Sequence, residues 1–212
     1  MGQNGCCLRI FISNMSKQKN TPEFIAQRIA ESIAVKQNIL GNPYLMAHIE
    51  QTANLLTQTF AAHGKVLLCG NGGSAADAQH IAAELSGRFF IDRPALFAEA
   101  LHVNTSFLTA VANDYGYESV FARMVQAMGK KNDVLIAIST SGNSPNVVRA
   151  AQQAKEQGMK VVGMTGEKGG QLANLCDFCL QIPSVVTPRI QEAHILIGHI
   201  WCEWVEQQIF GA

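Results

Sequence analysis

Two short stretches of this chain combine glycine, amide and hydroxyl residues in patterns that suit anion binding. The first is "GNGGS", residues 70–74, which follows the apolar run "KVLLC". Its glycines allow backbone N–H groups to approach a ligand closely. The second is "STSGNS", residues 139–144, which places four hydroxyl groups just before a helix predicted from Pro145. Hydroxyl groups, backbone N–H groups and a helix N-terminus together favour a phosphate held by dipoles, because no cationic residue lies in this loop.

Each stretch also has a simpler interpretation. Ser144 alone would serve as a helix N-cap, with the other hydroxyl residues forming a polar turn. Gly70, Gly72 and Ala75 satisfy G-x-G-x-x-A, a dinucleotide-binding pattern. However, no well-placed second strand ends in an acidic residue about 20 residues later, and the GK[ST] of a nucleotide P-loop is missing. We therefore expect phosphate binding at the second stretch and no dinucleotide at the first.

Two predicted helices carry polar residues that suit acid–base or metal chemistry. His80 and Glu84 are four residues apart after the glycine stretch, so they share a helix face. Gln191, His194 and His199 interrupt an otherwise apolar run near the C-terminus. Polar groups on a buried helix require partners. From spacing alone, a polar helix face, a hydrogen-bond network in the core and a subunit contact all remain open for these residues.

These residues need a fold that brings strand ends and helix faces together. Short apolar runs alternate with helical patterns along the chain, which predicts an α/β fold with a parallel sheet. Ligands of such sheets bind at the carboxyl ends of the strands, where both anion-binding stretches lie. Strands are predicted at 65–69, 96–101 (the weakest pattern), 133–138, 160–166 and 176–183, and helices at 22–40, 43–62, 75–85, 145–157 and 188–210.

The helix starts and the domain limits follow from local signals. Thr21 and Thr187 are predicted N-caps, because Pro22 and Pro188 then occupy the first helical positions. No linker rich in Pro, Gly or Ser divides the chain. We expect one domain over residues 21–212, including the N-terminal helices, preceded by an extension over residues 1–20 without fixed structure.

Composition excludes several classes of function. The 212 residues include 16 basic and 16 acidic side chains, a formal net charge of +0, and no block of like charge. Nucleic-acid binding through phosphate neutralisation therefore has no global support. No apolar run is long enough for a membrane span or a signal peptide. We expect a cytoplasmic protein that binds neither nucleic acid nor membrane.

The six cysteines indicate a reducing compartment more than a disulfide framework. Cys69 and Cys202 lie in apolar runs, where free cysteines act as small core residues. Cys176 and Cys179 form a CxxC pattern within a predicted strand. Because residues i and i+3 of a strand point to opposite faces, we expect no redox or zinc role for this pair.

Several sequence blocks together resemble a known family. In order along the chain they are "CGNGGSAADAQH", "ANDYGY", "ISTSGNS", "MTGEKGG" and "RIQEAHILIGH". They resemble the SIS (sugar isomerase) fold over residues 20–210 and, more specifically, the phosphoheptose isomerase family. The resemblance implies a parallel five-stranded sheet flanked by helices, with flavodoxin-like layering and a helical N-terminal addition. It also implies a homotetramer with sites at subunit borders, which fits the apolar surplus of the N-terminal and last helices.

The resemblance also assigns roles to residues. It implies a metal site, usually zinc with one ion per subunit, at His80, Glu84, Gln191 and His199, and it makes Glu84 and His199 the catalytic acid/base pair. His194 is expected to be structural. The positions that match substrate-binding residues of the family are Asn71, Gly72, Gly73, Glu84, Asn113, Asp114, Ser139, Thr140, Ser141, Ser144 and Gln191.

The activity implied by the resemblance is an aldose–ketose isomerisation. Sedoheptulose 7-phosphate would become D-glycero-D-manno-heptose 7-phosphate through an enediol, the first step towards ADP-heptose and the lipopolysaccharide core. The main alternative is a non-enzymatic SIS-domain adaptor that binds the bacterial replication initiator protein. That relative lacks the catalytic glutamate and the last histidine. Since Glu84 and His199 are both present here, the enzyme is the expected function.

Overall fold

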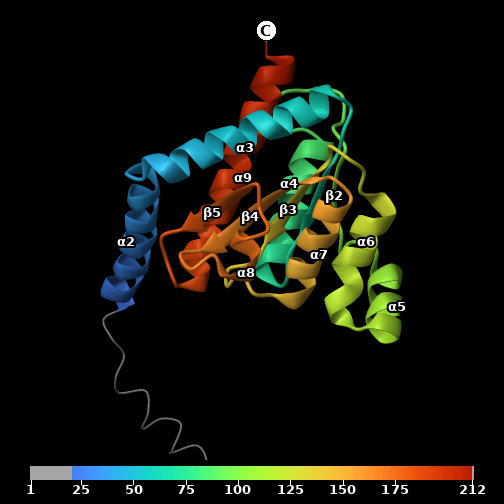
Figure 1. The fold of residues 1–212 in the computed structure, drawn as a ribbon. Helices are drawn as coiled ribbons and strands as arrows, with labels where there is room; N and C mark the ends of the chain where they lie inside the picture. Colours follow the sequence, from blue (N-terminus) through green and yellow to red (C-terminus); the bar gives the residue numbers. More distant parts are fainter. Residues whose placement is uncertain (1–20, 212) are drawn as a thin grey trace, which may run out of the picture. The chain divides into compact units, whose positions relative to one another are not determined.

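The computed structural model of the chain describes residues 21–211 (Figure 1). The extension expected over residues 1–20 lies outside the described residues. The chain divides into two compact units, residues 1–34 and 35–212. The boundary falls inside one helix, α2 (Thr21–Leu40), so a single domain starting at residue 21 stays a prediction.

The described part of the first unit is the N-terminal portion of α2. The described helix starts at Thr21, so the prediction of Thr21 as an N-cap outside the helix is wrong. Ile25, Ile29 and Ile33 recur every four residues and therefore share one face of the helix. Each of these three side chains is at least half exposed, at 52%, 56% and 50%. This segment thus carries an apolar stripe that is exposed in the described part of the chain.

The second unit is built on a five-stranded parallel sheet, as the sequence predicted. The strand order is β2-β1-β3-β4-β5, and every neighbouring pair is parallel. This is the flavodoxin-like order, in which the chain reverses direction across the sheet between β1 and β3. The strands are β1 (Val66–Cys69), β2 (Ala98–Ala100), β3 (Val134–Ile138), β4 (Lys160–Gly166) and β5 (Phe178–Ile182).

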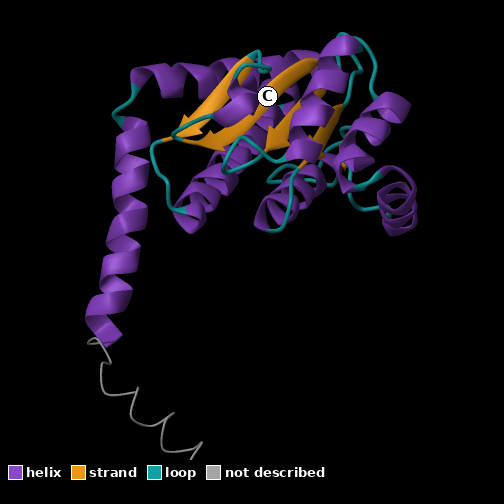
Figure 2. Ribbon diagram, turned by 60° about the horizontal axis from the view of Figure 1, so that its bottom comes forward, coloured by secondary structure: helices purple, strands orange, loops and turns teal. Residues whose placement is uncertain are grey.

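Helices cover both faces of this sheet, as Figure 2 shows. Alternate strand residues point to opposite faces, so the core has two parts. On one face, Leu68, Ile136 and Met164 pack with α3 (Pro43–Ala61), α4 (Gly73–Ser86) and α9 (Thr187–Phe210). On the other face, Leu67, Leu135 and Val161 pack with α5, α6 and α7, whose bounds are Thr105–Tyr115, Val120–Met128 and Pro145–Glu156.

Four elements were not predicted from the sequence. They are α5, the 3₁₀ turn η2 (Tyr117–Ser119), α6 and α8 (Gly170–Ala173). The Asn104 side chain caps α5 by accepting the Phe107 N–H at 3.0 Å. Gly116, with φ of 84°, then ends the helix. In "ANDYGY", the polar residues Asn113 and Asp114 thus belong to the last turn of α5, and Gly116 separates that helix from η2.

Two further local predictions are wrong. Thr187 is the first residue of α9 and not its N-cap, which is Val186. Cys176 does not belong to β5, because the strand begins only at Phe178. The alternation argument that separated the two cysteines of the CxxC pattern therefore does not apply to Cys176. Among residues 21–211, no helix is both long and apolar enough to cross a membrane.

Candidate functional site

The glycine stretch connects β1 directly to α4. Helix α4 begins at Gly73, two residues earlier than predicted, so the connection is short. Gly72 has φ of 56°, a left-handed conformation that favours glycine. A Cβ on Gly70 would lie 2.5 Å from the Ser74 carbonyl oxygen, which only glycine avoids. The N-terminus of α4 is thereby fixed at the carboxyl edge of the sheet, where ligands of this fold bind.

The loop at residues 139–144, called the Ser/Thr loop below, is held by its backbone from two sides. The Gly166 N–H at the end of β4 donates to the Thr140 carbonyl at 2.9 Å. The Leu172 N–H of α8 donates to the Gly142 carbonyl at 3.0 Å. Gly142 itself has φ of 66°, and a Cβ there would collide with the Gly169 carbonyl oxygen. The loop conformation is therefore set by its contacts with two neighbouring segments.

The three serine hydroxyl groups of the Ser/Thr loop lie close together. Ser139 Oγ lies 3.0 Å from Ser144 Oγ and 3.5 Å from Ser141 Oγ. Ser144 is the N-cap residue of α7, yet its side chain makes no capping hydrogen bond. Plain helix capping therefore does not account for these hydroxyl groups. Their arrangement at a helix N-terminus suits an anion.

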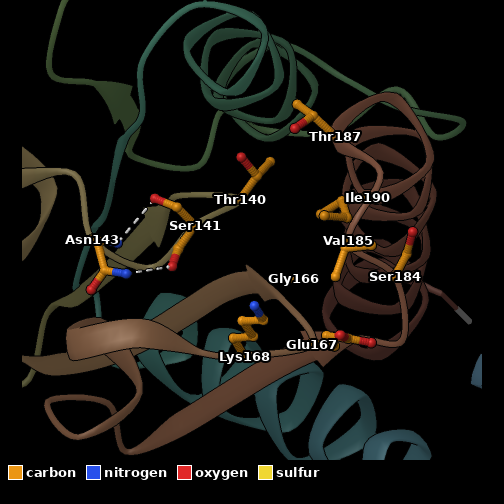
Figure 3. A pocket seen from close by; sticks show the side chains of 10 residues that line it. All are labelled: Thr140, Ser141, Asn143, Gly166, Glu167, Lys168, Ser184, Val185, Thr187 and Ile190. Carbon is orange, nitrogen blue, oxygen red and sulfur yellow. Dashed lines mark hydrogen bonds between the residues drawn. The ribbon is translucent and has the colours of Figure 1, made fainter.

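A cavity of about 300 Å³ opens beside this loop (Figure 3). Thr140 and Ser141 line it from the loop, and Lys168 points into it from the segment after β4. Lys168 is the one cationic side chain among the ten lining residues. The cavity therefore offers a positive charge in addition to the hydroxyl and N–H dipoles that the loop sequence indicated. The complete lining is Thr140, Ser141, Asn143, Gly166, Glu167, Lys168, Ser184, Val185, Thr187 and Ile190.

The sequence prediction missed Lys168, Ser184 and Thr187. A signal for Lys168 was present, because "MTGEKGG" follows a predicted strand and so lies at the same sheet edge as the other two loops. Ser184 and Thr187 follow β5 in the same way. The carboxyl ends of β4 and β5 could thus have been selected by the same reasoning that selected those of β1 and β3.

A second part of the candidate site lies between α4 and α9. His80 Nε2 is 3.2 Å from Glu84 Oε1 and 3.5 Å from His199 Nε2. We call these three side chains the histidine group. The two helices lie close together beside it, because Gly198 has no side chain and Ile81 occupies that space. The structure thus brings both predicted catalytic residues to one place, joined through His80.

The fourth predicted metal ligand, Gln191, lies elsewhere along these helices. Its side chain rests against Gly73, where a Cβ would come within 2.5 Å of Nε2. Gly73 precedes His80 by seven residues, or roughly 10 Å of helix rise. In the described residues no group of three or more His, Cys, Asp or Glu side chains is arranged to hold a metal ion. Zinc binding therefore stays a prediction that rests on the types of the donor groups.

The remaining predicted substrate residues fall into two sets. Asn71 exchanges two hydrogen bonds with the buried Asn146, at 2.9 and 2.8 Å, and also accepts one from the Tyr117 hydroxyl at 3.2 Å. Its side chain therefore braces the start of α7, a role the sequence did not indicate. Asn113 and Asp114 are exposed on the last turn of α5, where the Asn113 amide donates to the Asp114 carboxylate at 2.9 Å.

Two titratable residues on α9 and α4, the helices that carry the histidine group, have environments that shift their pKa. His194 is fully buried, and burial lowers its pKa to about 4, although its bond to the Thr165 carbonyl at 3.2 Å opposes the shift. This neutral histidine supports the core, as expected. Burial raises the pKa of Asp77 to about 6, and the charge of His80 opposes this shift.

A buried ion pair positions Phe89, whose ring lies beside His199. Arg93 Nε lies 2.8 Å from Glu206 Oε1, and both side chains are 1% exposed. Burial raises the pKa of Glu206, but hydrogen bonds from the N–H groups of residues 89–91 and from Arg93 outweigh it and hold that pKa below its usual range. Glu206 accepts the Phe89 N–H at 2.7 Å, and the Phe89 ring centroid lies 5.6 Å from the His199 ring centroid.

Known proteins share this architecture and sequence. The SIS domain family matches residues 29–166. A phosphoheptose isomerase from Aneurinibacillus thermoaerophilus is 52% identical over 188 residues, which cover 89% of this chain and 95% of that protein. The solved phosphoheptose isomerase from Neisseria gonorrhoeae has a TM-score of 0.82 at 45% identity, and the match covers 88% of this chain and 98% of that one. The enzyme from Francisella tularensis has a TM-score of 0.85 at 37% identity, with 89% and 100% coverage.

Proposed function

The chain belongs to the phosphoheptose isomerase family of SIS-domain proteins, and we propose that it converts sedoheptulose 7-phosphate into D-glycero-D-manno-heptose 7-phosphate. The observation that carries this proposal is the pairing of the Ser/Thr loop with the histidine group. One is suited to a phosphate, and the other holds a carboxylate and two imidazoles within hydrogen-bonding distance. Phosphate binding and proton transfer are the two tasks that a sugar phosphate isomerase must combine.

The spacing of these two parts supports a long sugar phosphate. Ile190 lines the cavity beside the Ser/Thr loop, and the next residue, Gln191, rests against the first residue of α4. From there the histidine group is about two helical turns away, or roughly 10 Å. A ligand that reaches both parts must carry its phosphate at the end opposite the reacting carbons. Sedoheptulose 7-phosphate does so, because its phosphate is on C7 and its isomerisation involves C1 and C2.

The chemistry assigned to the histidine group is proton transfer through an enediol. One group must remove a proton from carbon, and another must move protons at the neighbouring oxygens. We assign the first role to Glu84 and the second to His199, with the Ser/Thr loop positioning the substrate by its phosphate. Substrate contacts at Asn71, Gly72, Gly73, Asn113, Asp114 and Gln191 belong to the same proposal.

Zinc is the proposed metal. His80, Glu84, Gln191 and His199 would hold it, and imidazole nitrogen and carboxylate oxygen are donors that zinc accepts. When bound, the ion would stabilise negative charge on the enediolate oxygens. Gln191 lies about two helical turns from the histidine group. A complete ligand set would therefore need these side chains to move together when zinc binds, or a donor from a neighbouring subunit.

A homotetramer is the proposed assembly. The apolar stripe of Ile25, Ile29 and Ile33 supports burial against another copy, since an exposed stripe of this kind is costly in water. Light scattering at micromolar concentration should report four chains per particle. A monomer under these conditions would contradict a site completed by neighbouring subunits. The four free cysteines of the described residues support a reducing compartment, and we propose the cytoplasm.

The direct experiment is incubation of the purified chain with sedoheptulose 7-phosphate and zinc, followed by NMR detection of the aldose heptose phosphate. Unphosphorylated sedoheptulose is the matched control and should react far more slowly, because it lacks the group that the Ser/Thr loop binds. The similarity to phosphoheptose isomerases disfavours the adaptor alternative. Absence of turnover with added zinc would revive it, and binding to the replication initiator protein would become the next assay.

A further inference from the structure

Two cysteines that the proposed isomerisation does not use share one space in the structure. Cys179 of β5 pairs in register with Gly163 of β4. A Cβ on Gly163 would lie 2.5 Å from Cys176 Sγ and 3.4 Å from Cys179 Sγ. Because Gly163 has no side chain, both sulfur atoms lie beside it on the same side of the sheet. We call Cys176 and Cys179 the dithiol pair.

The backbone explains why the two sulfur atoms meet. Cys176 lies in the turn after α8, two residues before β5 begins. Asp177 fixes this turn, since its N–H donates to the Val161 carbonyl at 2.8 Å and its carboxylate accepts the Val161 N–H at 2.9 Å. Strand alternation therefore starts only after Cys176, and the turn directs its side chain back over Gly163.

The two thiols have different surroundings. The Cys176 S–H donates to the Leu172 carbonyl at 3.1 Å, a bond that stabilises the protonated thiol. Cys179 Sγ lies 3.8 Å from the Thr165 hydroxyl. The neighbouring Cys176 thiol lowers the pKa of the Cys179 thiol, with help from the Thr165 hydroxyl and against the effect of burial. The neighbouring Cys179, together with burial, raises the pKa of Cys176.

The other two described cysteines provide an internal contrast. Cys69 and Cys202 are fully buried in the core. Burial raises the pKa of each to about 12. Both members of the dithiol pair are only partly buried. Since the thiolate is the reactive form, the partial exposure of Cys179, the thiol beside it and its lowered pKa together favour Cys179 as the most reactive of these four thiols.

We propose that Cys176 and Cys179 are a redox-active site that reacts with low-molecular-weight disulfides. In the first step the Cys179 thiolate attacks one sulfur of the disulfide R–S–S–R, forms a mixed disulfide and releases one RS⁻. In the second step Cys176 loses its proton to solvent, and its sulfur attacks Cys179 Sγ. The Cys176–Cys179 disulfide forms and a second RS⁻ leaves. The two thiols are oxidised by two electrons, and R–S–S–R is reduced to two thiols.

The test is thiol mapping of the reduced, full-length chain in buffers with a graded ratio of oxidised to reduced glutathione. After acid quenching and alkylation, trypsin separates every cysteine site of the chain. Cys176 and Cys179 fall in peptide 169–189, Cys69 in 66–88, Cys202 in 190–212, and the N-terminal pair in 1–9. We expect peptide 169–189 to lose two hydrogens, at least about tenfold faster than the Cys69 and Cys202 peptides are modified, and to regain them with dithiothreitol.

Two single variants distinguish the roles of the thiols. Cys176→Ser should stop the reaction at the first step and leave glutathione attached to Cys179. Cys179→Ser should leave Cys176 largely unmodified over the same period. The proposal is overturned if both thiols of peptide 169–189 stay free in the wild-type chain, or if each is capped by glutathione without an internal disulfide. It is also overturned if Cys69 and Cys202 react as fast, because unfolding would then explain the modification.

Discussion

The Ser/Thr loop and the histidine group differ in what holds them in place. The loop is fixed by backbone hydrogen bonds to the end of β4 and to α8, at 2.9 and 3.0 Å. The histidine group consists of side chains on two helices, and the His80 side chain is 49% exposed. The conformation of the loop is thus set by bonds within a single chain. The histidine group brings His80, Glu84 and His199 close together, but within residues 21–211 no three such side chains are arranged to hold a metal ion.

This difference has a general physical cause. A loop at a strand end takes its shape from the sheet register and from glycines with positive φ, which a single chain determines fully. Side chains that carry charge or lone pairs gather closely only when a cation or a partner offsets their repulsion and desolvation. We therefore expect the loop to bind phosphate in the isolated chain and the histidine group to depend on metal and assembly.

The largest expected effect is on turnover, from changes in the histidine group. Glu84→Gln keeps the shape and removes the proposed base, so kcat should fall by about 10²-fold or more, as is usual for general acid–base residues. His199→Asn should do likewise. Steady-state kinetics with sedoheptulose 7-phosphate measures both, and zinc content is determined in parallel because either change also removes a proposed ligand.

Matched controls for these variants exist at exposed positions outside the histidine group. Glu203 is exposed on α9, where its carboxylate accepts only the Gln207 amide, at 3.2 Å. His63 is exposed beyond the end of α3, at φ of 58°, a conformation that asparagine tolerates. Glu203→Gln and His63→Asn should leave kcat unchanged. Parent-like turnover in both Glu84→Gln and His199→Asn would show that the histidine group is not catalytic.

Metal removal should separate the two parts of the site. Dialysis against a chelator should lower kcat by about tenfold or more, because a bound cation contributes several kcal/mol to charge stabilisation. Calorimetric binding of inorganic phosphate should stay the same, since the Ser/Thr loop uses hydroxyl and N–H donors. Zinc should restore turnover. Equal loss of phosphate binding on chelation would mean that the loop also depends on the metal.

Ser141→Ala should produce a smaller effect, confined to binding. It removes one donor to the phosphate, and a hydrogen bond to a charged group contributes about 1.5–3 kcal/mol. KM should therefore rise by roughly 10- to 100-fold with thermal stability unchanged, because the Ser141 side chain is exposed. Ser106→Ala on the exposed face of α5 is the control. An unchanged KM and kcat would remove this loop from the site.

Lys168→Gln should give the smallest effect. Lys168 lines the cavity but is itself exposed, so its attraction for phosphate is screened by water and salt. A contribution of about 0.2–1 kcal/mol would raise KM only a few fold. The increase should shrink as salt is added, whereas the effect of Ser141→Ala should persist. Lys131→Gln, at an exposed site outside this cavity, should leave KM unaltered at any salt concentration.

Much of this protein follows from the order of its residues alone. Alternation of apolar runs with helical patterns gave the parallel sheet, because strand burial and helix periodicity are local properties. Glycines and hydroxyl residues after strands marked the candidate anion site, since strand ends of a parallel sheet share one edge. The helices between 105 and 128 were missed, because their short amphipathic segments are interrupted by asparagine, glycine and tyrosine.

Tertiary structure decided the features that depend on atoms far apart in the chain. The approach of His80 to His199 depends on Gly198, whose missing side chain lets α4 and α9 pack closely. The meeting of Cys176 with Cys179 depends on Gly163 in a neighbouring strand and on the turn that Asp177 holds. Gly198 is adjacent to His199 but far in sequence from Ile81 and His80, and Gly163 lies in a different strand from Cys179, so no local pattern reveals either contact. Packing between elements, which sequence periodicity does not encode, set both juxtapositions.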